Sequence, residues 1–118
     1  MPKATAPDSL EVRSMSPQMM EEVAARFRAL SDPNRLRLLQ LFVRKDRGVN
    51  ELAEAAGLTI ANTSKHLAIL CKAGLIRRTK EGTRVIYALD GPLSRQLCEL
   101  VCDDVRSQSR RALALADD

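Results

Sequence analysis

Basic side chains that could bind phosphate are concentrated in one segment of this 118-residue chain. From Lys65 to Arg84 there are six bases and one acid, a formal charge of +5, whereas the whole chain carries +4. The rest of the chain therefore has a slight excess of acid. Such a segment is either a solvated face or a surface for the phosphates of a nucleic acid. Its bases are Lys65, Lys72, Arg77, Arg78, Lys80 and Arg84.

The second group of reactive side chains is a pair of thiols, Cys98 and Cys102, four residues apart in a helical pattern. Residues at this spacing share a helix face with Cβ atoms about 5 to 6 Å apart, whereas a disulfide prefers about 3.5 to 4.5 Å. A direct disulfide is therefore disfavoured, but two thiolates could hold one soft ion such as As(III) or Sb(III), or a polysulfur bridge. Alternatively, both thiols pack as small hydrophobic side chains beside Leu97 and Val101.

Cys71 and His66 complete the set of potential ligands. We expect Cys71 at the margin of the buried side of its helix, where it either packs or serves as a third thiol if the last helix or a partner chain comes near. His66 is the only histidine, and we expect it to pack or hydrogen-bond locally. One histidine, three scattered cysteines and no glycine-rich phosphate loop form no catalytic set, so the sequence argues against an enzyme.

Capping residues and apolar spacing predict the helices that must position these side chains. Ser16-Pro17 and Asp32-Pro33 are typical helix starts, of a first amphipathic helix and a buried central second helix. The residues Val49 to Ala56 predict a short third helix. Gly57 then allows a sharp turn, and Thr59 caps a fourth helix, the order of a helix-turn-helix.

A β-hairpin and a last helix are expected after the fourth helix. Two β-branched runs surround a turn at Glu81-Gly82, and the segment 90–92 ends the second strand before an amphipathic helix. The segment 1–15 has mixed polarity and no sustained period, which predicts a flexible arm. We therefore expect one folded domain over 16–115.

The fourth helix has two unlike faces on a wheel of about 100° per residue. Its inner stripe is expected to contain Thr63, Leu67, Leu70 and Gly74. The opposite side, with Ala61, Lys65, Ala68 and Lys72, is small, polar or basic, a face that can enter a major groove.

Two apolar stripes remain uncovered in this arrangement. One runs from Met20 to Leu30 on the first helix and the other from Leu93 to Val105 on the last. A small domain has little core to cover both. We therefore expect the two helices to pair in a homodimer, which would place two DNA-reading helices about 34 to 36 Å apart, one turn of duplex.

Composition limits the class of protein. Hydrophobic residues make up 45% of the chain and there is no Trp, one Tyr and two Phe, so the core must be aliphatic. No run approaches the ~18 to 20 apolar residues of a membrane span, and the residues after Met1 lack the apolar stretch of a signal peptide. Three cysteines do not suit a secreted disulfide framework. We expect a cytoplasmic protein that does not enter a membrane.

Three strings at linked spacing carry a family resemblance: ALSDPNRLRLLQLF, then NELAEAAGLTIANTSKHLAILCKAGLI, then RRTKEGTRVIYAL. They lie between Ala29 and Asp90 and resemble the ArsR/SmtB family of winged helix-turn-helix repressors. The resemblance implies a mainly α fold, five helices with a two-stranded β-hairpin wing, in a homodimer joined through the first and last helices. It also implies that the protein binds double-stranded operator DNA and represses an operon until an inducer binds.

The resemblance further implies that the fourth helix meets the major groove and the wing meets adjacent phosphates. Side-chain chemistry agrees, because Asn62 can contact adenine through two hydrogen bonds and Lys65 can donate to guanine or neutralise a phosphate. Capping competes with base contact for Thr59, and anchoring of the motif competes with phosphate contact for Arg35. The implied DNA-binding residues are Thr59, Ile60, Ala61, Asn62, Ser64, Lys65, Arg77, Arg78, Lys80 and Arg84.

The positions of cysteine and histidine limit the class of inducer that the resemblance allows. Family members that sense soft metals through the third helix carry Cys-x-Cys there, which this chain lacks. Zinc sensors use His ligands on the last helix, and persulfide or oxidant sensors use a cysteine of the second helix; this chain has neither. Cys98 and Cys102, with Cys71 as an optional third thiol, remain the candidate inducer or metal ligands. No resident cofactor is expected.

The leading hypothesis is therefore a DNA-binding repressor that is released by a thiol-reactive inducer, namely As(III), Sb(III), reactive sulfur or an oxidant. The first alternative is a constitutive DNA-binding regulator whose cysteines only pack. The second is a protein interaction module on the same scaffold.

Overall fold

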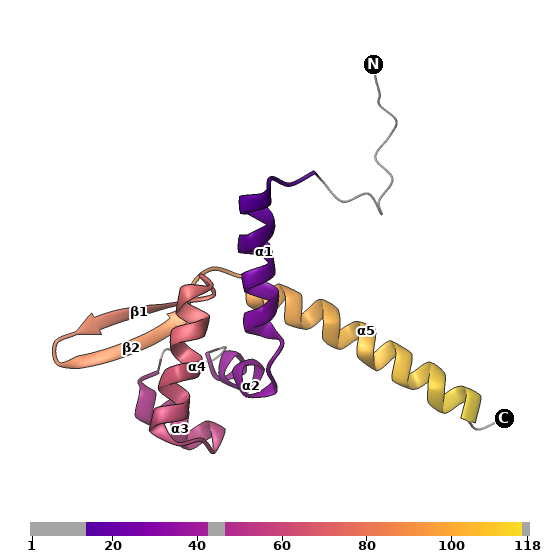
Figure 1. The fold of residues 1–118 in the computed structure, drawn as a ribbon. Helices are drawn as coiled ribbons and strands as arrows, with labels where there is room; N and C mark the ends of the chain where they lie inside the picture. The colour runs from indigo at the N-terminus through magenta and orange to yellow at the C-terminus, as the bar shows by residue number, and fades with distance from the viewer. Residues whose placement is uncertain (1–13, 43–46, 117–118) are drawn as a thin grey trace.

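The computed structural model describes residues 14–42 and 47–116. The described residues form five helices and one antiparallel pair of strands, as predicted (Figure 1). In chain order these are α1 (Pro17–Leu30), α2 (Pro33–Leu41), α3 (Val49–Ala56), α4 (Ile60–Lys72), β1 (Ile76–Glu81), β2 (Arg84–Leu89) and α5 (Leu93–Ala116). Nearly all of the expected arm over 1–15 lies outside the described residues.

The helices begin where side-chain caps predict. The Ser16 hydroxyl accepts a hydrogen bond from the Met19 N–H at 3.1 Å, and a proline occupies the first turn of both α1 and α2. The Asp32 carboxylate accepts from the N–H groups of Asn34 and Arg35 at 2.8 and 3.2 Å. These caps satisfy backbone donors that have no partner within the helix. The hydrogen bond from Arg35 is the main reason why the pKa of Asp32 is lowered.

An aliphatic core lies where α2, α3 and α4 meet. Its largest fully buried side chains are Leu38, Leu52, Leu67, Leu70 and Leu75, together with Thr63. Thr63 is tolerated there because its hydroxyl donates to the Thr59 carbonyl oxygen at 2.8 Å. The predicted inner stripe of α4 is thus confirmed, apart from Gly74, and α3 buries Leu52, Ala53 and Ala56 on its inner side.

Gly74 is not part of the inner stripe, because α4 ends at Lys72. Gly74 is exposed and takes a left-handed conformation with φ +77°. It reverses the chain so that the Leu75 N–H reaches the Leu70 carbonyl at 3.0 Å and the Gly74 N–H reaches that of Cys71 at 3.0 Å. The same pattern follows α3, where Gly57 has φ +69°, which confirms the predicted turn.

The hairpin is longer than the sequence indicated, and its turn is shifted by one residue. The register runs from Ile76 opposite Leu89 to Glu81 opposite Arg84, so the turn residues are Gly82 and Thr83 rather than Glu81 and Gly82. Its base is fixed to the segment before α3, because Arg47 and Tyr87 exchange backbone hydrogen bonds at 2.8 and 3.2 Å. We call the hairpin β1–β2 the wing.

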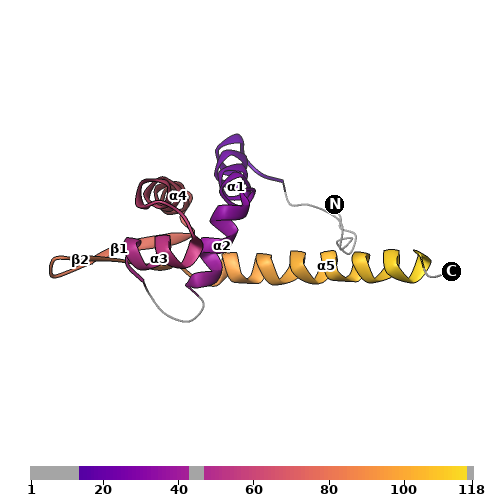
Figure 2. The ribbon, with the colours of Figure 1, turned by 90° about the horizontal axis from the view of Figure 1, so that it is seen from below.

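Helix α5 leaves the body on the side opposite to the wing, as Figures 1 and 2 show. It has 24 residues, and beyond its first turns Leu100, Val101 and Val105 are exposed. On α1, Met20 and Phe27 are exposed as well. The structure thus confirms the two uncovered apolar stripes. Among the described residues, no helix is both long and apolar enough to cross a membrane.

Candidate nucleic-acid interface

The outer face of α4 presents short polar and basic side chains to solvent. Asn62, Ser64 and Lys65 are exposed on it, and Ala61 leaves room for a close approach. Ile60, at the start of the helix, is 54% exposed. Thr59 is exposed too, but its hydroxyl accepts from the Asn62 N–H at 3.1 Å, so the predicted capping role is confirmed.

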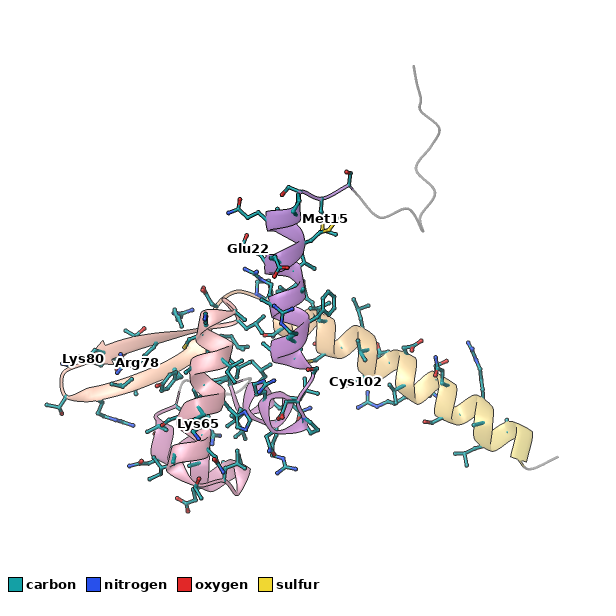
Figure 3. All side chains as sticks on the ribbon, viewed as in Figure 1. Met15, Glu22, Lys65, Arg78, Lys80 and Cys102 are labelled. Atoms are coloured by element: carbon teal, nitrogen blue, oxygen red, sulfur yellow. The ribbon has the colours of Figure 1, made fainter. Side chains whose placement is uncertain are left out.

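The wing supplies positive charge beside this helix. Figure 3 shows Arg78 and Lys80 on the hairpin and Lys65 on α4, all on the side of the molecule away from α5. Neither Arg78 nor Lys80 forms a hydrogen bond or ion pair with another described residue. Both are exposed and are therefore available to phosphates.

Two other arginines of the wing already have partners. Arg77 donates to the Leu89 carbonyl oxygen at 2.6 Å, across the base of the hairpin. Arg84 forms an ion pair with Glu51 of α3 at 2.8 Å, and the same Glu51 oxygen accepts from the Gly48 N–H at 3.4 Å. Arg84 therefore ties the wing to the N-terminus of α3. Sequence reasoning missed this pair, whose members are 33 residues apart.

Arg35 anchors the motif, one of the two roles that the sequence left open. Its guanidinium donates to the carbonyl oxygens of Ala29 and Arg28 at 2.7 and 3.1 Å, and its third nitrogen lies 3.3 Å from His66 Nδ1. The end of α1 and the middle of α4 are thereby joined through α2. His66 bonds locally, as predicted.

Cys98 and Cys102 are half-buried free thiols on α5. Burial, and secondarily the neighbouring Cys102, raises the pKa of Cys98. Two cavities meet at these thiols, one of about 410 Å³ towards the ends of α2 and β2 and one of about 330 Å³ towards α1. Figure 3 places Cys102 in the first half of α5, beside the body.

Cys71 packs against the main core, and burial raises its pKa while the Arg78 charge opposes the rise. Over residues 14–42 and 47–116, no group of three or more His, Cys, Asp or Glu side chains is arranged to hold a metal ion. The structure of one chain therefore does not bring Cys71 together with Cys98 and Cys102 in such a group.

Comparison with known proteins gives the family. The model of the bacterial regulatory protein family arsR matches residues 32–78, which include α2 to α4. The HTH-type transcriptional regulator CmtR of Mycobacterium bovis is 44% identical over 86 residues, which cover 71% of this chain and 73% of CmtR. The chain belongs to the arsR family of bacterial regulatory proteins. This family is one of regulators rather than enzymes, in agreement with the prediction.

Other relatives and one solved structure agree with a DNA-binding regulator. A probable mercury resistance operon repressor of Streptomyces lividans is 38% identical over 66 residues, 56% of this chain and 53% of the relative. The chain spans 59% of the length of Rv0081, an HTH-type regulator of Mycobacterium tuberculosis. A solution structure of the homodimeric winged helix-turn-helix domain of Mb0332 from M. bovis has a TM-score of 0.74 and 27% identity, and covers 85% of this chain and 95% of that domain. The fold is a winged helix-turn-helix.

Proposed function

We propose that the protein is a sequence-specific DNA-binding transcriptional repressor. The observation that carries the proposal is that two exposed surfaces, the outer face of α4 and the basic wing, lie on the same side of the molecule, away from α5 (Figure 3). The α4 face offers hydrogen-bonding groups for base edges, and the wing offers unpaired positive charge for phosphates. In this proposal Thr59, Ile60, Ala61, Asn62, Ser64 and Lys65 lie in the major groove, and Arg77, Arg78, Lys80 and Arg84 face the adjacent backbone. Binding to operator DNA would place the protein in the cytoplasm.

A homodimer joined through α1 and α5 would complete the DNA-binding unit. The exposed side chains of Phe27, Leu100 and Val101 support it, since apolar patches on helices are otherwise costly. The homodimeric state of the Mb0332 domain supports it as well. A two-fold axis would present two copies of α4 about 34 to 36 Å apart, so the operator would be an inverted repeat.

The inducer, in this proposal, is a thiol-reactive species that acts on Cys98 and Cys102. The two thiols are free, share one helix and open onto two cavities. The mercury resistance repressor among the relatives makes a soft, thiol-binding ion a reasonable class of ligand, with As(III), Sb(III) and reactive sulfur in the same class. Because α5 would form the dimer, a ligand there would change the spacing of the two copies of α4.

A gel shift with the promoter upstream of the gene tests the DNA-binding function. We expect specific binding that weakens steeply with salt, because counterions are released from the phosphates. No binding to any upstream fragment at low salt would contradict the proposal and favour an interaction module.

The same assay, titrated with arsenite, antimonite, mercuric ion and a persulfide donor, tests the inducer. We expect release of the wild type and no response in the double variant Cys98→Ser with Cys102→Ser, while Cys71→Ser responds as the wild type does. A wild type that ignores every thiol reagent would identify the alternative, a constitutive regulator. The half-burial of Cys98 and its raised pKa are the observations that favour this alternative.

A further inference from the structure

The first helix contacts the rest of the molecule mainly through its last turn. Of the 14 residues of α1, only Ala29 is buried. Met19, Met20 and Phe27, nearer the start of the helix, are exposed. Figure 1 shows α1 rising from the body, with α2 at its C-terminal end. The orientation of α1 relative to the DNA-reading helix α4 therefore depends on a few contacts at this end.

One guanidinium forms hydrogen bonds to both α1 and α4. Arg35 of α2 donates from Nε to the Ala29 carbonyl oxygen at 2.7 Å and from one terminal nitrogen to that of Arg28 at 3.1 Å. Both oxygens belong to the last turn of α1, where carbonyl groups need partners from outside the helix. The other terminal nitrogen of Arg35 lies 3.3 Å from Nδ1 of His66 on α4. Because a guanidinium can only donate, His66 Nδ1 accepts and the ring proton is on Nε2.

We call Arg35 and His66 the clamp. Within the described part of the chain, no other hydrogen bond links α1 to α4, either directly or through α2. Arg26 of α1 comes near the end of α4, but its guanidinium donates to the Glu22 carbonyl oxygen of its own helix at 3.1 Å. The burial of Ala29 holds the helices together without fixing a direction, since hydrophobic attraction is non-directional. The clamp is therefore the directional contact between α1 and α4.

We propose that the clamp sets the angle between α1 and α4 and thereby the half-site spacing that the dimer accepts. The proposal rests on the proposed function, in which α1 joins the two copies and α4 reads the DNA. With α1 held in the dimer interface, the angle between the two helices determines how far apart the two copies of α4 lie. His66 is then a positioning residue, which selects the operator without touching DNA.

The orientation is tested first without DNA, by residual dipolar couplings of the full chain in nuclear magnetic resonance. In the wild type, the amides of α1 and α4 should fit one alignment tensor. In His66→Leu the couplings of α1 should no longer fit the tensor of α4, because the acceptor of the clamp is gone. His66→Asn is the conservative variant and should behave as the wild type does, since its Oδ1 can accept in place of Nδ1. A single tensor for both helices of His66→Leu would overturn the proposal.

The consequence for DNA is tested with operators that carry extra base pairs between the half-sites, each of which adds about 3.4 Å. Two extra base pairs should weaken binding of the wild type about tenfold or more, because both copies of α4 can no longer bind at once. The same insertion should weaken binding of His66→Leu no more than about threefold, since a looser α1 lets both copies reach their half-sites. Binding to a single half-site should be equal in the two proteins.

Arg37→Gln is the matched control. It removes the hydrogen bond from Arg37 to the Ala56 carbonyl oxygen at 3.2 Å, which joins α2 to α3 and does not involve α1. This variant should keep the spacing preference of the wild type. Equal spacing preferences in the wild type and His66→Leu, or a preference lost in Arg37→Gln as well, would overturn the proposal. A wild type that binds neither a half-site nor an inverted repeat would contradict the proposed function, and the dipolar couplings would still report on the clamp.

Discussion

Asn62 and Lys65 on α4 differ from Arg78 and Lys80 on the wing in the kind of contact that they can make. An amide or ammonium at a base edge discriminates between bases, whereas a guanidinium at a phosphate does not. Among the wing residues, the structure separates exposed, unpaired side chains from those that already have partners. Predictions for single residues follow from this separation.

Asn62→Ala should relax discrimination at one position of the operator and cost about 1 to 3 kcal/mol of specific binding if the contact is bidentate. Lys80→Ala should instead weaken binding to all sequences, and should flatten the salt dependence by about one charge. Binding to operator and random duplexes at several salt concentrations measures both effects. If the two variants behaved alike, the assignment of base contacts to α4 and of phosphate contacts to the wing would be wrong.

Glu51 holds the Arg84 guanidinium at 2.8 Å. The Glu51 carboxylate should therefore compete with a DNA phosphate for this guanidinium. Glu51→Gln should therefore raise affinity at low salt and steepen its salt dependence. A double-mutant cycle checks the cause, because Arg84→Ala should cost more in the Glu51→Gln background than in the wild type. An equal cost in both backgrounds would show that Arg84 does not leave Glu51 for phosphate.

At the scale of elements, the start of α2 depends on an ionised cap. Because the pKa of Asp32 is lowered in the fold, the stabilisation is present above the unfolded value, near 3.8, and is lost as pH falls through the folded value. Asp32→Asn keeps a capping oxygen without the titration. We expect the loss of helix signal with falling pH, monitored by circular dichroism, to be less steep below pH 4 for the variant than for the wild type. Identical curves for both proteins would contradict this role.

The end of α4 depends on a left-handed residue. Gly74 has φ +77°, and a Cβ there would lie 3.1 Å from a guanidinium nitrogen of Arg26. Gly74→Ala should lower the free energy of unfolding by about 1 to 2 kcal/mol, the cost of a side chain in this conformation. Gly74→Asn is the matched control and should lose less, because Asn tolerates the left-handed region better. Denaturant unfolding measures both, and an unchanged Gly74→Ala variant would contradict the assigned cap.

At the scale of the whole molecule, the central expectation is the dimer. Val101 is 58% exposed on the apolar stripe of α5, so Val101→Glu should place a charge in the interface and yield monomers in analytical ultracentrifugation. Leu113→Glu is the control, since Leu113 is similarly exposed but lies about 120° round the helix from Val101. If the Val101→Glu variant remained a dimer, Val101 would not lie in the dimer interface.

The monomeric Val101→Glu variant should also bind an inverted repeat more weakly than the wild type, because each copy of α4 then binds its half-site alone. Its binding to one half-site should be unchanged. Loss of half-site binding would mean that the substitution damages the DNA-binding body itself.

The sequence by itself determined the features that depend on neighbours along the chain. Caps such as Ser16, Asp32 and Thr59 bond backbone groups two or three residues away, and Gly57 needs no partner beyond its own turn. The spacing of apolar residues in α4 likewise predicted that Leu67 and Leu70 belong to the core. These signals are local, so they needed no knowledge of the fold, and the family resemblance rested on the same strings.

Only the tertiary structure decided the features that join distant segments. Strand pairing set the wing turn at Gly82-Thr83, and it required the register of both strands. The ion pair between Arg84 and Glu51 and the anchoring of Arg35 both depend on elements meeting in space. Such contacts follow from the packing of whole helices and strands. The spacing of residues in the sequence does not predict this packing.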